Sequence, residues 1–467
     1  MKRLLSYGIR LIKHGCGKYT MKNLAERSHS FAPKGHWQKK TRLFLKTQSR
    51  HIPALEIILS KMWCFTVNVW LKLRYRKTLI ENLINGYYCK NIDPDRTFWI
   101  SPNIIEYSGL IEFDIQRFKG HVIAGEWDKL EMKFCDIDLY RASNFVVNEG
   151  GNWEDTLFYK RIVHKISNGE IYWNCSDEQT FKTRCENIEL LFYEIKSHGY
   201  KTQKQLLRQQ SLDSRKLDDE ITVSVGRYGN LLFSNSAHRL VIAKLIPLEA
   251  IPTKISVRHP LWVKFVKQLN SYINLLAAKA PHSFTHPDLE QIYSSNIGGQ
   301  VYNLIRQHSS YQAGELLDVG AKLGYYSSKF QDNGFNCYAT EAEFFELDLL
   351  SKIKKAERYS FDIINFSNLK PEWLLNRRFD ITLALSSLHY FLKTKELYSE
   401  LTAILRNLNT NELFFLPNEF VDSDKHQFYK QYTPQQFVQA ILLNSSLSRS
   451  ELIGYTQYGT PLFRLFK

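Results

Sequence analysis

Acidic and glycine residues recur between residues 315 and 341 at spacings that suit a nucleotide-type cofactor. The segment ELLDVGAKLG places Asp318, Gly320 and Gly324 at the end of a short apolar run. We predict a buried strand that turns tightly into a helix, because glycine lets the backbone approach a ligand closely. A second apolar run ends at Glu341, 23 residues after Asp318. Nucleotide-binding α/β domains place a carboxylate for ribose hydroxyls at an interval of roughly 20 residues. These four residues are therefore our candidate cofactor-binding set.

Polar side chains also follow a third apolar run. RFDITLAL (378–385) has the pattern of a further buried strand, and it continues into the sequence SSLHYF. Open α/β sheets bind ligands at the carboxyl ends of their strands. We therefore take His389 as the candidate catalytic base, and a structural histidine packed beside Tyr390 is the alternative. Glu343 is the alternative to Glu341 as the ribose-binding acid.

Another set of candidate ligand-binding residues lies in the middle of the chain. TVSVGRYGNLLF (222–233) predicts two short strands around a glycine turn, followed by a helix that begins near His238 and Arg239. The next predicted strand, IPTKISVRH, ends at Arg258 and His259. Cations gathered at one helix N-terminus would suit an anion. We therefore predict that His238, Arg239 and Arg258 form an anion-binding site.

Cysteine usage gives no indication of a metal site. The seven cysteines are scattered without a CxxC pair, and an odd number cannot all pair within one chain. This spacing argues against zinc and is typical of a reducing compartment. We therefore predict no metal site and a cytoplasmic location.

The net charge of +15 is concentrated at the N-terminus. Residues 1–80 hold 18 Lys and Arg against two acids, whereas the rest of the chain holds 44 basic and 45 acidic residues. The uneven charge does not favour a nucleic-acid-binding protein as a whole. A hydrophobic content of 44% excludes a disordered chain. The basic arm over 1–80 could bind nucleic acid or an anionic membrane surface, or it could cover the neighbouring domain. Peripheral attachment to a membrane follows if it binds lipid.

Composition divides the 467 residues into three regions. We predict a basic helical arm over 1–85, an α+β domain over 90–267 and an α/β domain over 270–467. Strand and helix patterns alternate in the last region, which predicts a mostly parallel sheet. The sequence near its end predicts an antiparallel hairpin around Gly459. Ala54–Leu71 is about long enough to span a bilayer but carries charges, so we favour a partly buried or surface-lying helix there.

The C-terminal third resembles the class I S-adenosylmethionine-dependent methyltransferases. LLDVGAKLGYYS is similar to the first motif of that superfamily, TEAE to the acidic end of its second strand, and RFDITLALSSLHYF to its fourth-strand motif. The resemblance implies a Rossmann-like sheet, a terminal antiparallel hairpin and S-adenosylmethionine as cofactor. The chain departs from it at Lys322, where many members have glycine. It also departs near Asn365, where an acid that contacts adenine is common.

The middle region resembles the ParB/sulfiredoxin-like fold. The resemblance rests on GRYGNLLFSNSAHRLVIAK followed by IPTKISVRH, with the flanking motifs GEWD and NWEDT. It implies that the turn before His238 and Arg239 binds phosphate or a nucleotide. Asn235 and Ser236 stand where Asp and Gly are usual, so an inactive binding module is an open alternative to a catalytic one.

Together these features predict an S-adenosylmethionine-dependent methyltransferase. We expect the ParB-like domain to recognise a phosphorylated, nucleotide-linked or surface-glycan small molecule and the C-terminal domain to methylate it. The alternative is a non-catalytic or regulatory protein that binds a ligand or nucleic acid and carries a degenerate methyltransferase domain. The sequence leaves the methyl acceptor and the oligomeric state open.

Overall fold

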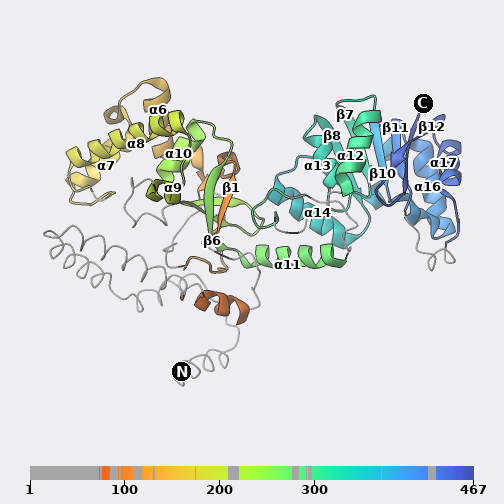
Figure 1. Cartoon of the computed structure of the whole chain (residues 1–467), viewed down its shortest axis with the longest axis horizontal. Helices are drawn as coiled ribbons and strands as arrows, with labels where there is room; N and C mark the ends of the chain where they lie inside the picture. The colour runs from red at the N-terminus through yellow and green to blue at the C-terminus, as the bar shows by residue number, and fades with distance from the viewer. Residues whose placement is uncertain are drawn as a thin grey trace, which may run out of the picture. The chain divides into compact units, whose positions relative to one another are not determined.

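The computed structural model places two compact units, residues 1–264 (unit 1) and 265–467 (unit 2) (Figure 1). The structure describes residues 73, 76–84, 93, 96–108, 118–129, 132–173, 175–208, 220–275, 283–290, 292, 297–369, 371–418 and 428–467. The predicted basic arm lies outside these ranges except for residue 73 and a helical stretch over 76–84. The apolar segment Ala54–Leu71 also lies outside them. Each unit is built around its own sheet, and the mixed α/β fold predicted from the sequence is confirmed.

Unit 1 contains a six-stranded mixed sheet in the order β1-β6-β4-β5-β2-β3. Its strands are β1 (Thr97–Ile100), β2 (Tyr107–Ser108), β3 (Met132–Lys133), β4 (Ile221–Val225), β5 (Leu231–Asn235) and β6 (Ile251–Arg258). β4 and β5 form the hairpin predicted around the glycine turn, and β6 pairs parallel to β4. The ParB/sulfiredoxin assignment stays a prediction.

The helices of unit 1 are α6 (Asp138–Glu149), α7 (Leu157–Ser167), α8 (Glu178–His198), α9 (Gln203–Arg208) and α10 (Ala237–Leu245), and α11 (Pro260–Leu275) runs across the unit boundary. Two of them, α7 and α8, begin at capping side chains and bury aromatic residues. Thr156 and Asp177 each accept a hydrogen bond from a first-turn N–H, of α7 and α8 respectively. Phe158 and Phe181 are fully buried with their ring centroids 6.0 Å apart. These contacts hold α7 against α8.

The GEWD and GRYG motifs of unit 1 meet where Arg227 pairs with both Glu126 and Asp128. Asp128 is buried and accepts hydrogen bonds from the Arg227 backbone N–H at 2.6 Å and from its Nη2 at 2.7 Å. Burial acts to raise the pKa of Asp128, but the Arg227 hydrogen bonds outweigh it and lower the pKa. Arg227 also donates to the carbonyl of Gly125 at 2.9 Å. Both motifs therefore stabilise the loop structure beside β4.

Unit 2 contains a seven-stranded sheet in the order β12-β13-β11-β10-β7-β8-β9. Its strands are β7 (Gly314–Val319), β8 (Phe335–Glu341), β9 (Asp362–Asn365), β10 (Phe379–Leu385), β11 (Thr410–Leu416), β12 (Arg449–Tyr455) and β13 (Pro461–Phe466). The five strands from β7 to β11 pair in parallel, whereas β13 pairs antiparallel to both β11 and β12. The structure thus has the mostly parallel sheet and the terminal antiparallel hairpin that the sequence predicts.

Helices cover both faces of this sheet. They are α12 (Ile297–His308), α13 (Tyr325–Gln331), α14 (Phe344–Glu357), α15 (Pro371–Leu375), α16 (Lys395–Asn407) and α17 (Pro434–Leu443). Successive strand residues point to opposite faces, so Leu316 and Phe414 join one buried cluster while Leu317 and Phe415 join the other. Burial on both faces explains why these strands are continuous apolar runs in the sequence.

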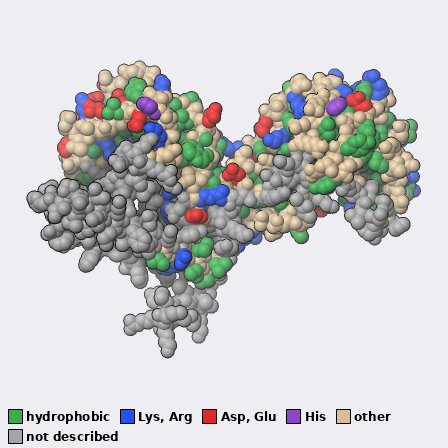
Figure 2. Space-filling view, viewed as in Figure 1, with side chains coloured by type: hydrophobic (Ala, Val, Ile, Leu, Met, Phe, Trp, Pro, Cys, Tyr) green, Lys and Arg blue, Asp and Glu red, His purple; other side chains and the backbone are tan. Residues whose placement is uncertain are grey.

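The surface of the described residues shows no concentration of one charge on the face in Figure 2. Acidic and basic side chains are scattered there among apolar ones, in keeping with the near balance of charge outside the arm. Within the described ranges, no helix is both long and apolar enough to cross a bilayer. Those ranges also contain no group of three or more His, Cys, Asp or Glu that could hold a metal ion.

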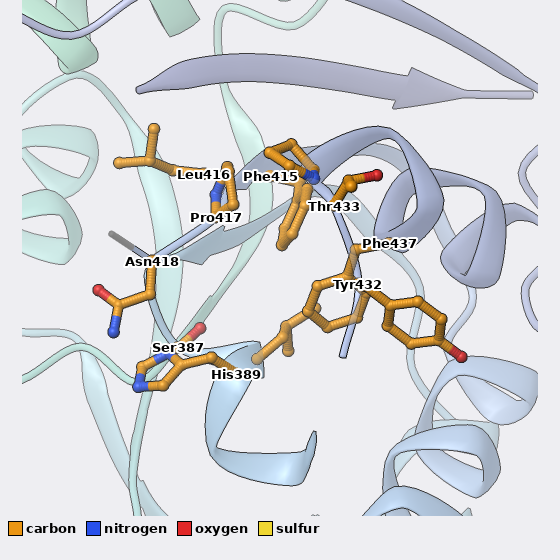
Figure 3. A pocket seen from close by; sticks show the side chains of 11 residues that line it. Ser387, His389, Phe415, Leu416, Pro417, Asn418, Tyr432, Thr433 and Phe437 are labelled. Atoms are coloured by element: carbon orange, nitrogen blue, oxygen red, sulfur yellow. The ribbon is translucent and has the colours of Figure 1, made fainter. Parts of the chain in front are cut away.

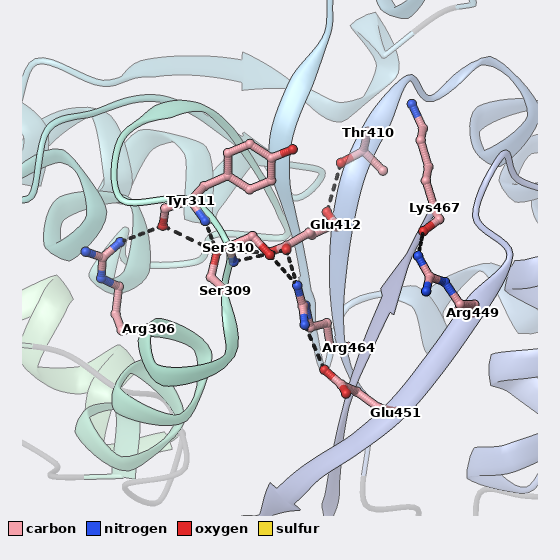
Figure 4. Close-up of polar contacts among 10 residues, drawn as sticks. All are labelled: Arg306, Ser309, Ser310, Tyr311, Thr410, Glu412, Arg449, Glu451, Arg464 and Lys467. Atoms are coloured by element: carbon pink, nitrogen blue, oxygen red, sulfur yellow. Dashed lines mark hydrogen bonds and ion pairs between the residues drawn. The ribbon is translucent and has the colours of Figure 1, made fainter.

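A buried ion pair ties β11 to β13 and to the segment before β7 (Figure 4). Glu412 is buried; it pairs with Arg464 and accepts hydrogen bonds from Ser309 Oγ at 2.9 Å and from the Ser310 N–H at 3.1 Å. Arg464 also donates to Glu451, on the exposed side of the network, at 2.9 Å. The network joins three parts of unit 2 that are far apart in sequence.

Replacement of Glu412 tests this network. We expect Glu412→Gln to lower the free energy of unfolding by about 3–5 kcal/mol, because it removes the buried partner of Arg464. Glu451→Gln is the matched control, since this side chain is 42% exposed and such a pair contributes up to about 1 kcal/mol. Urea unfolding of the full chain measures both, and equal effects would contradict the assignment.

Candidate functional site

The turn after β7 lies against the end of β10 because Gly320 has no side chain. Its φ is +76°, and a Cβ added there would lie 2.6 Å from the Cβ of Ser387. Gly324, four residues on, has φ +77°, and an added Cβ would lie 2.8 Å from a methyl carbon of Leu350. Both positions therefore require glycine for conformation and for space. The N–H groups of Gly320 and Ala321 donate to the carbonyl of Thr340 on β8, which fixes the turn.

Asp318 holds the same turn from within the sheet. It is 2% exposed and accepts a hydrogen bond from Ser327 Oγ, on α13, at 2.7 Å. Burial raises the pKa of Asp318 to about 6, although the hydrogen bonds from Ser327 act to lower it. Asp318 therefore joins the end of β7 to the first turns of α13.

Glu341 lies at the end of β8, beside the turn. Its Oε2 accepts the N–H of Lys322 at 3.0 Å, and its Oε1 accepts the N–H of Ala342 at 2.7 Å. Burial raises the pKa of this carboxyl, and the neighbouring Glu346 carboxylate raises it further. Glu343, the alternative ribose-binding acid, is exposed and precedes α14. The structure thus places Glu341, and not Glu343, in contact with the turn.

His389 lies in the short 3₁₀ helix after β10, Leu388–Leu392. Burial lowers the pKa of His389 to about 4, and the nearby charges of Lys322 and Lys393 lower it further. Lys322 has φ +51° and Ser386 has φ +59°. Non-glycine residues in this region are strained, and such strain clusters at functional sites. Because the charge of Lys322, a residue of the glycine turn, acts on His389, the candidate base lies close to that turn.

A pocket that is partly open to solvent adjoins His389 (Figure 3). Ser387, His389 and Asn418 form its polar end, and aromatic side chains form the opposite wall. Phe437 is central to that wall, with its ring centroid 5.0 Å from that of Phe415 and 5.5 Å from that of Tyr432. The strand ends of β10 and β11 and the start of α17 therefore build a pocket with one polar and one apolar end.

The predicted anion-binding residues of unit 1 are not brought together. His238 and Arg239 begin α10, beside the end of β5, where Asn235 pairs with Thr222. Arg258 pairs with Val225, at the other end of β4. Val225 is three residues from Thr222, which corresponds to about 10 Å along the strand at about 3.3 Å per residue. The sequence prediction assumed convergence, but the parallel register of β4 and β6 sends Arg258 to the opposite end of the sheet.

His238 and Arg239 have separate environments in unit 1. The His238 ring packs edge-on against Trp173, with the centroids 4.1 Å apart. Burial lowers the pKa of His238 to about 4, and Arg184 and Arg239 lower it further. Arg239 lies 4.0 Å from a carboxylate oxygen of the buried Glu220. His238 is therefore neutral at pH 7 and supplies no positive charge for an anion there.

Sequence reasoning missed several residues of the unit 2 site. Ser387, which faces Gly320, lies within RFDITLALSSLHYF but was not predicted as a site residue, and Glu346 lies outside the motifs. The pocket wall on α17 does have a signal, since Thr433 and Gln436 form a capping box with Pro434 at the first helical position. That pattern predicts where the helix begins, but it does not indicate which strand end lies opposite.

Comparisons with known proteins return distant structural likenesses. No family model and no curated protein matches the chain. A structure of the bifunctional kinase-methyltransferase WbdD is 15% identical over 42% of this chain and 46% of its own, with a TM-score of 0.30. The [4+2]-cyclase SpnF is 16% identical over 41% of this chain and 73% of its own, with a TM-score of 0.31. N-methyltransferase NodS from Bradyrhizobium japonicum WM9 is 13% identical over 37% of this chain and 96% of its own, with a TM-score of 0.29.

This chain spans less than half the length of the WbdD structures that it matches. At these identities and TM-scores, the likenesses assign no activity. Any functional conclusion therefore depends on the residues of the site.

The protonation of His389 gives a direct test of its environment. We expect its ring C–H resonances to titrate with a midpoint near pH 4, compared with about 6.5 for an ordinary histidine. Because the folded-state pKa lies below the unfolded value, protonation from pH 6.5 down to 4 favours the unfolded chain and lowers stability. NMR of the histidine-labelled protein, with His389→Gln to assign the signal, measures the midpoint, and a value near 6.5 would contradict burial of this ring.

Proposed function

We propose that unit 2 binds S-adenosylmethionine and transfers its methyl group to an acceptor in the pocket beside His389. The observation that carries this proposal is the shared edge of β10, β7 and β8. Their carboxyl ends place His389, Gly320 and Glu341 around one turn, next to the pocket. Open α/β sheets bind their ligands at such an edge.

The residues of this edge fit the proposed cofactor. Gly320 and Gly324 let the turn pack closely against Ser387 and Leu350, the side chains that an added Cβ would meet. Glu341 offers a carboxylate for ribose hydroxyls, and Asp318 supports the turn. Ser387 Oγ is buried, with no hydrogen-bond partner among the residues that the structure describes. Buried polar atoms without a partner are costly, so this hydroxyl is suited to contact a ligand at the same edge.

The chemistry requires mainly that the protein bind and orient the reactants. S-adenosylmethionine supplies a methyl group on a positively charged sulfur, so the leaving group is already activated. The imidazole of His389 is neutral at pH 7 and can accept a proton from a hydroxyl or amine. Its pKa near 4 makes it a weak base, so alignment of the acceptor contributes more than proton removal. His389 stays our candidate base, with a hydrogen-bonding role in orienting the acceptor.

The pocket indicates how an acceptor would lie. Its polar end, Ser387 and His389, is the end next to Gly320 and hence to the cofactor turn. Its apolar end, around Phe437, would hold the body of the acceptor. An acceptor with a hydroxyl or amine at one end and a planar or apolar body suits this lining. Recognition of a phosphorylated or glycan-type group by unit 1, and of nucleic acid or membrane by the arm over 1–80, stay proposals.

Calorimetry with S-adenosylhomocysteine, the demethylated product, tests the proposed cofactor site. We expect saturable binding to the full chain and its loss in Gly320→Arg, because that side chain would enter the space beside Ser387. Gly459→Arg is the matched control: Gly459 has a similar φ of +80°, but nothing lies within 4 Å of an added Cβ. It shares the conformational cost, which is about 1–2 kcal/mol, and should leave binding intact.

Two outcomes of that experiment would reject the proposed function. One is the absence of saturable binding by the wild-type chain. The other is unchanged binding by Gly320→Arg, since the ligand would then lie elsewhere. Thermal unfolding of both variants shows whether they remain folded.

A further inference from the structure

A tyrosine of α11 contacts the acidic first turn of α14. Tyr272 donates its hydroxyl hydrogen to Glu346, and its ring packs edge-on against Phe345 with the centroids 5.7 Å apart. Both Tyr272 and Glu346 are partly buried. The proposed chemistry uses neither residue. A hydrogen bond to a carboxylate in a partly buried setting is strong, so Tyr272 fixes the position of the Glu346 carboxylate.

Glu346 in turn lies beside Glu341, the candidate ribose-binding acid. The charge of Glu346 acts on Glu341, and the charges of both carboxylates act on Tyr272. Glu341 is only 5% exposed. Burial and the neighbouring charge of Glu346 therefore both disfavour the ionised form of Glu341.

Glu341 also contacts the turn after β7. Glu341 accepts the N–H of Lys322 at 3.0 Å. Hydrogen bonds therefore join Tyr272 on α11 to Glu346, and Glu341 to the turn after β7, while the charge of Glu346 acts on Glu341. The remaining neighbour across the sheet, Asn365 on β9, is uncharged. Glu346 and Tyr272 are titratable side chains that interact with Glu341, and Lys322 contacts it through its backbone N–H.

We propose that Tyr272 and Glu346 are positioning residues that set the protonation of Glu341 and thereby the affinity of unit 2 for its nucleotide cofactor. This inference rests on the proposed function, because it assigns the ribose hydroxyls to Glu341. Those hydroxyls are donors, and only the ionised carboxylate accepts from both. Tyr272 holds the Glu346 carboxylate in place, and the charge of Glu346 disfavours ionisation of Glu341. A protonated Glu341 must lose its proton when the cofactor binds, so binding weakens as the pH falls.

The pH dependence of S-adenosylhomocysteine affinity tests this inference. In the wild-type chain, we expect the dissociation constant to rise about tenfold per pH unit below the midpoint. Glu346→Gln removes the neighbouring charge and should move the midpoint to lower pH by about one unit. Tyr272→Phe should move it in the same direction by less, because the Glu346 carboxylate is then no longer held in place by the tyrosine hydroxyl. The double variant should match Glu346→Gln, since Tyr272 acts through Glu346.

Two matched variants serve as controls. Asp348→Asn removes an exposed acid of the same helix, whose partner is Lys352. Tyr302→Phe removes a tyrosine hydroxyl that donates to the carbonyl of Lys329 at 3.5 Å. Neither should move the midpoint. Calorimetry from pH 5.5 to 8.5, with thermal unfolding to show that each variant folds, provides the data.

The outcomes separate this inference from the proposed function. Wild-type binding with an unshifted midpoint in both Glu346→Gln and Tyr272→Phe would overturn the inference alone. Additive shifts in the double variant would overturn the claim that Tyr272 acts through Glu346. Absence of wild-type binding at every pH would overturn the proposed function and this inference together.

Discussion

The site in unit 2 depends on the close approach of the turn after β7 to the end of β10. That approach is possible because Gly320 has no Cβ and adopts a left-handed conformation. Neighbouring features follow from it: the N–H groups of the turn reach Thr340, Lys322 reaches Glu341, and His389 lies near the charge of Lys322. Any side chain at Gly320 would separate two strand ends that the pocket and the candidate base both need.

Burial also gives the site its electrostatic character. It raises the pKa of Asp318 to about 6 and lowers that of His389 to about 4. In both cases burial disfavours the charged form. Shifted pKa values of this kind are common at functional sites, although Asp318 also holds the turn after β7 through its hydrogen bond from Ser327. The Glu412–Arg464 pair differs, because hydrogen-bonding partners surround its buried carboxylate and its role is structural.

The sequence predicts the elements of the site better than the contacts between them. β7, β8 and β10 are recognisable because strands buried on both faces are continuous apolar runs that end in polar or glycine residues. The hairpin of β12 and β13 is likewise predictable from its turn at Gly459. The pairing of Glu341 with Glu346 was not predicted, because it depends on how α14 leaves the sheet. Arg258 was expected beside His238 because strand register cannot be read from a single chain, and register places it at the other end of β4.

The position of β13 has a consequence for how this domain is made. β13 lies between β11 and β12, so the inner strand of the sheet's antiparallel end is the last one in the chain order. On the ribosome, β11 would expose an unpaired edge until residues 461–466 emerge. Until then, Glu412 would also lack its ion-pair partner Arg464. Unpaired edges of partly formed sheets are prone to aggregate. Unit 2 therefore completes its sheet only after β13 has been synthesised.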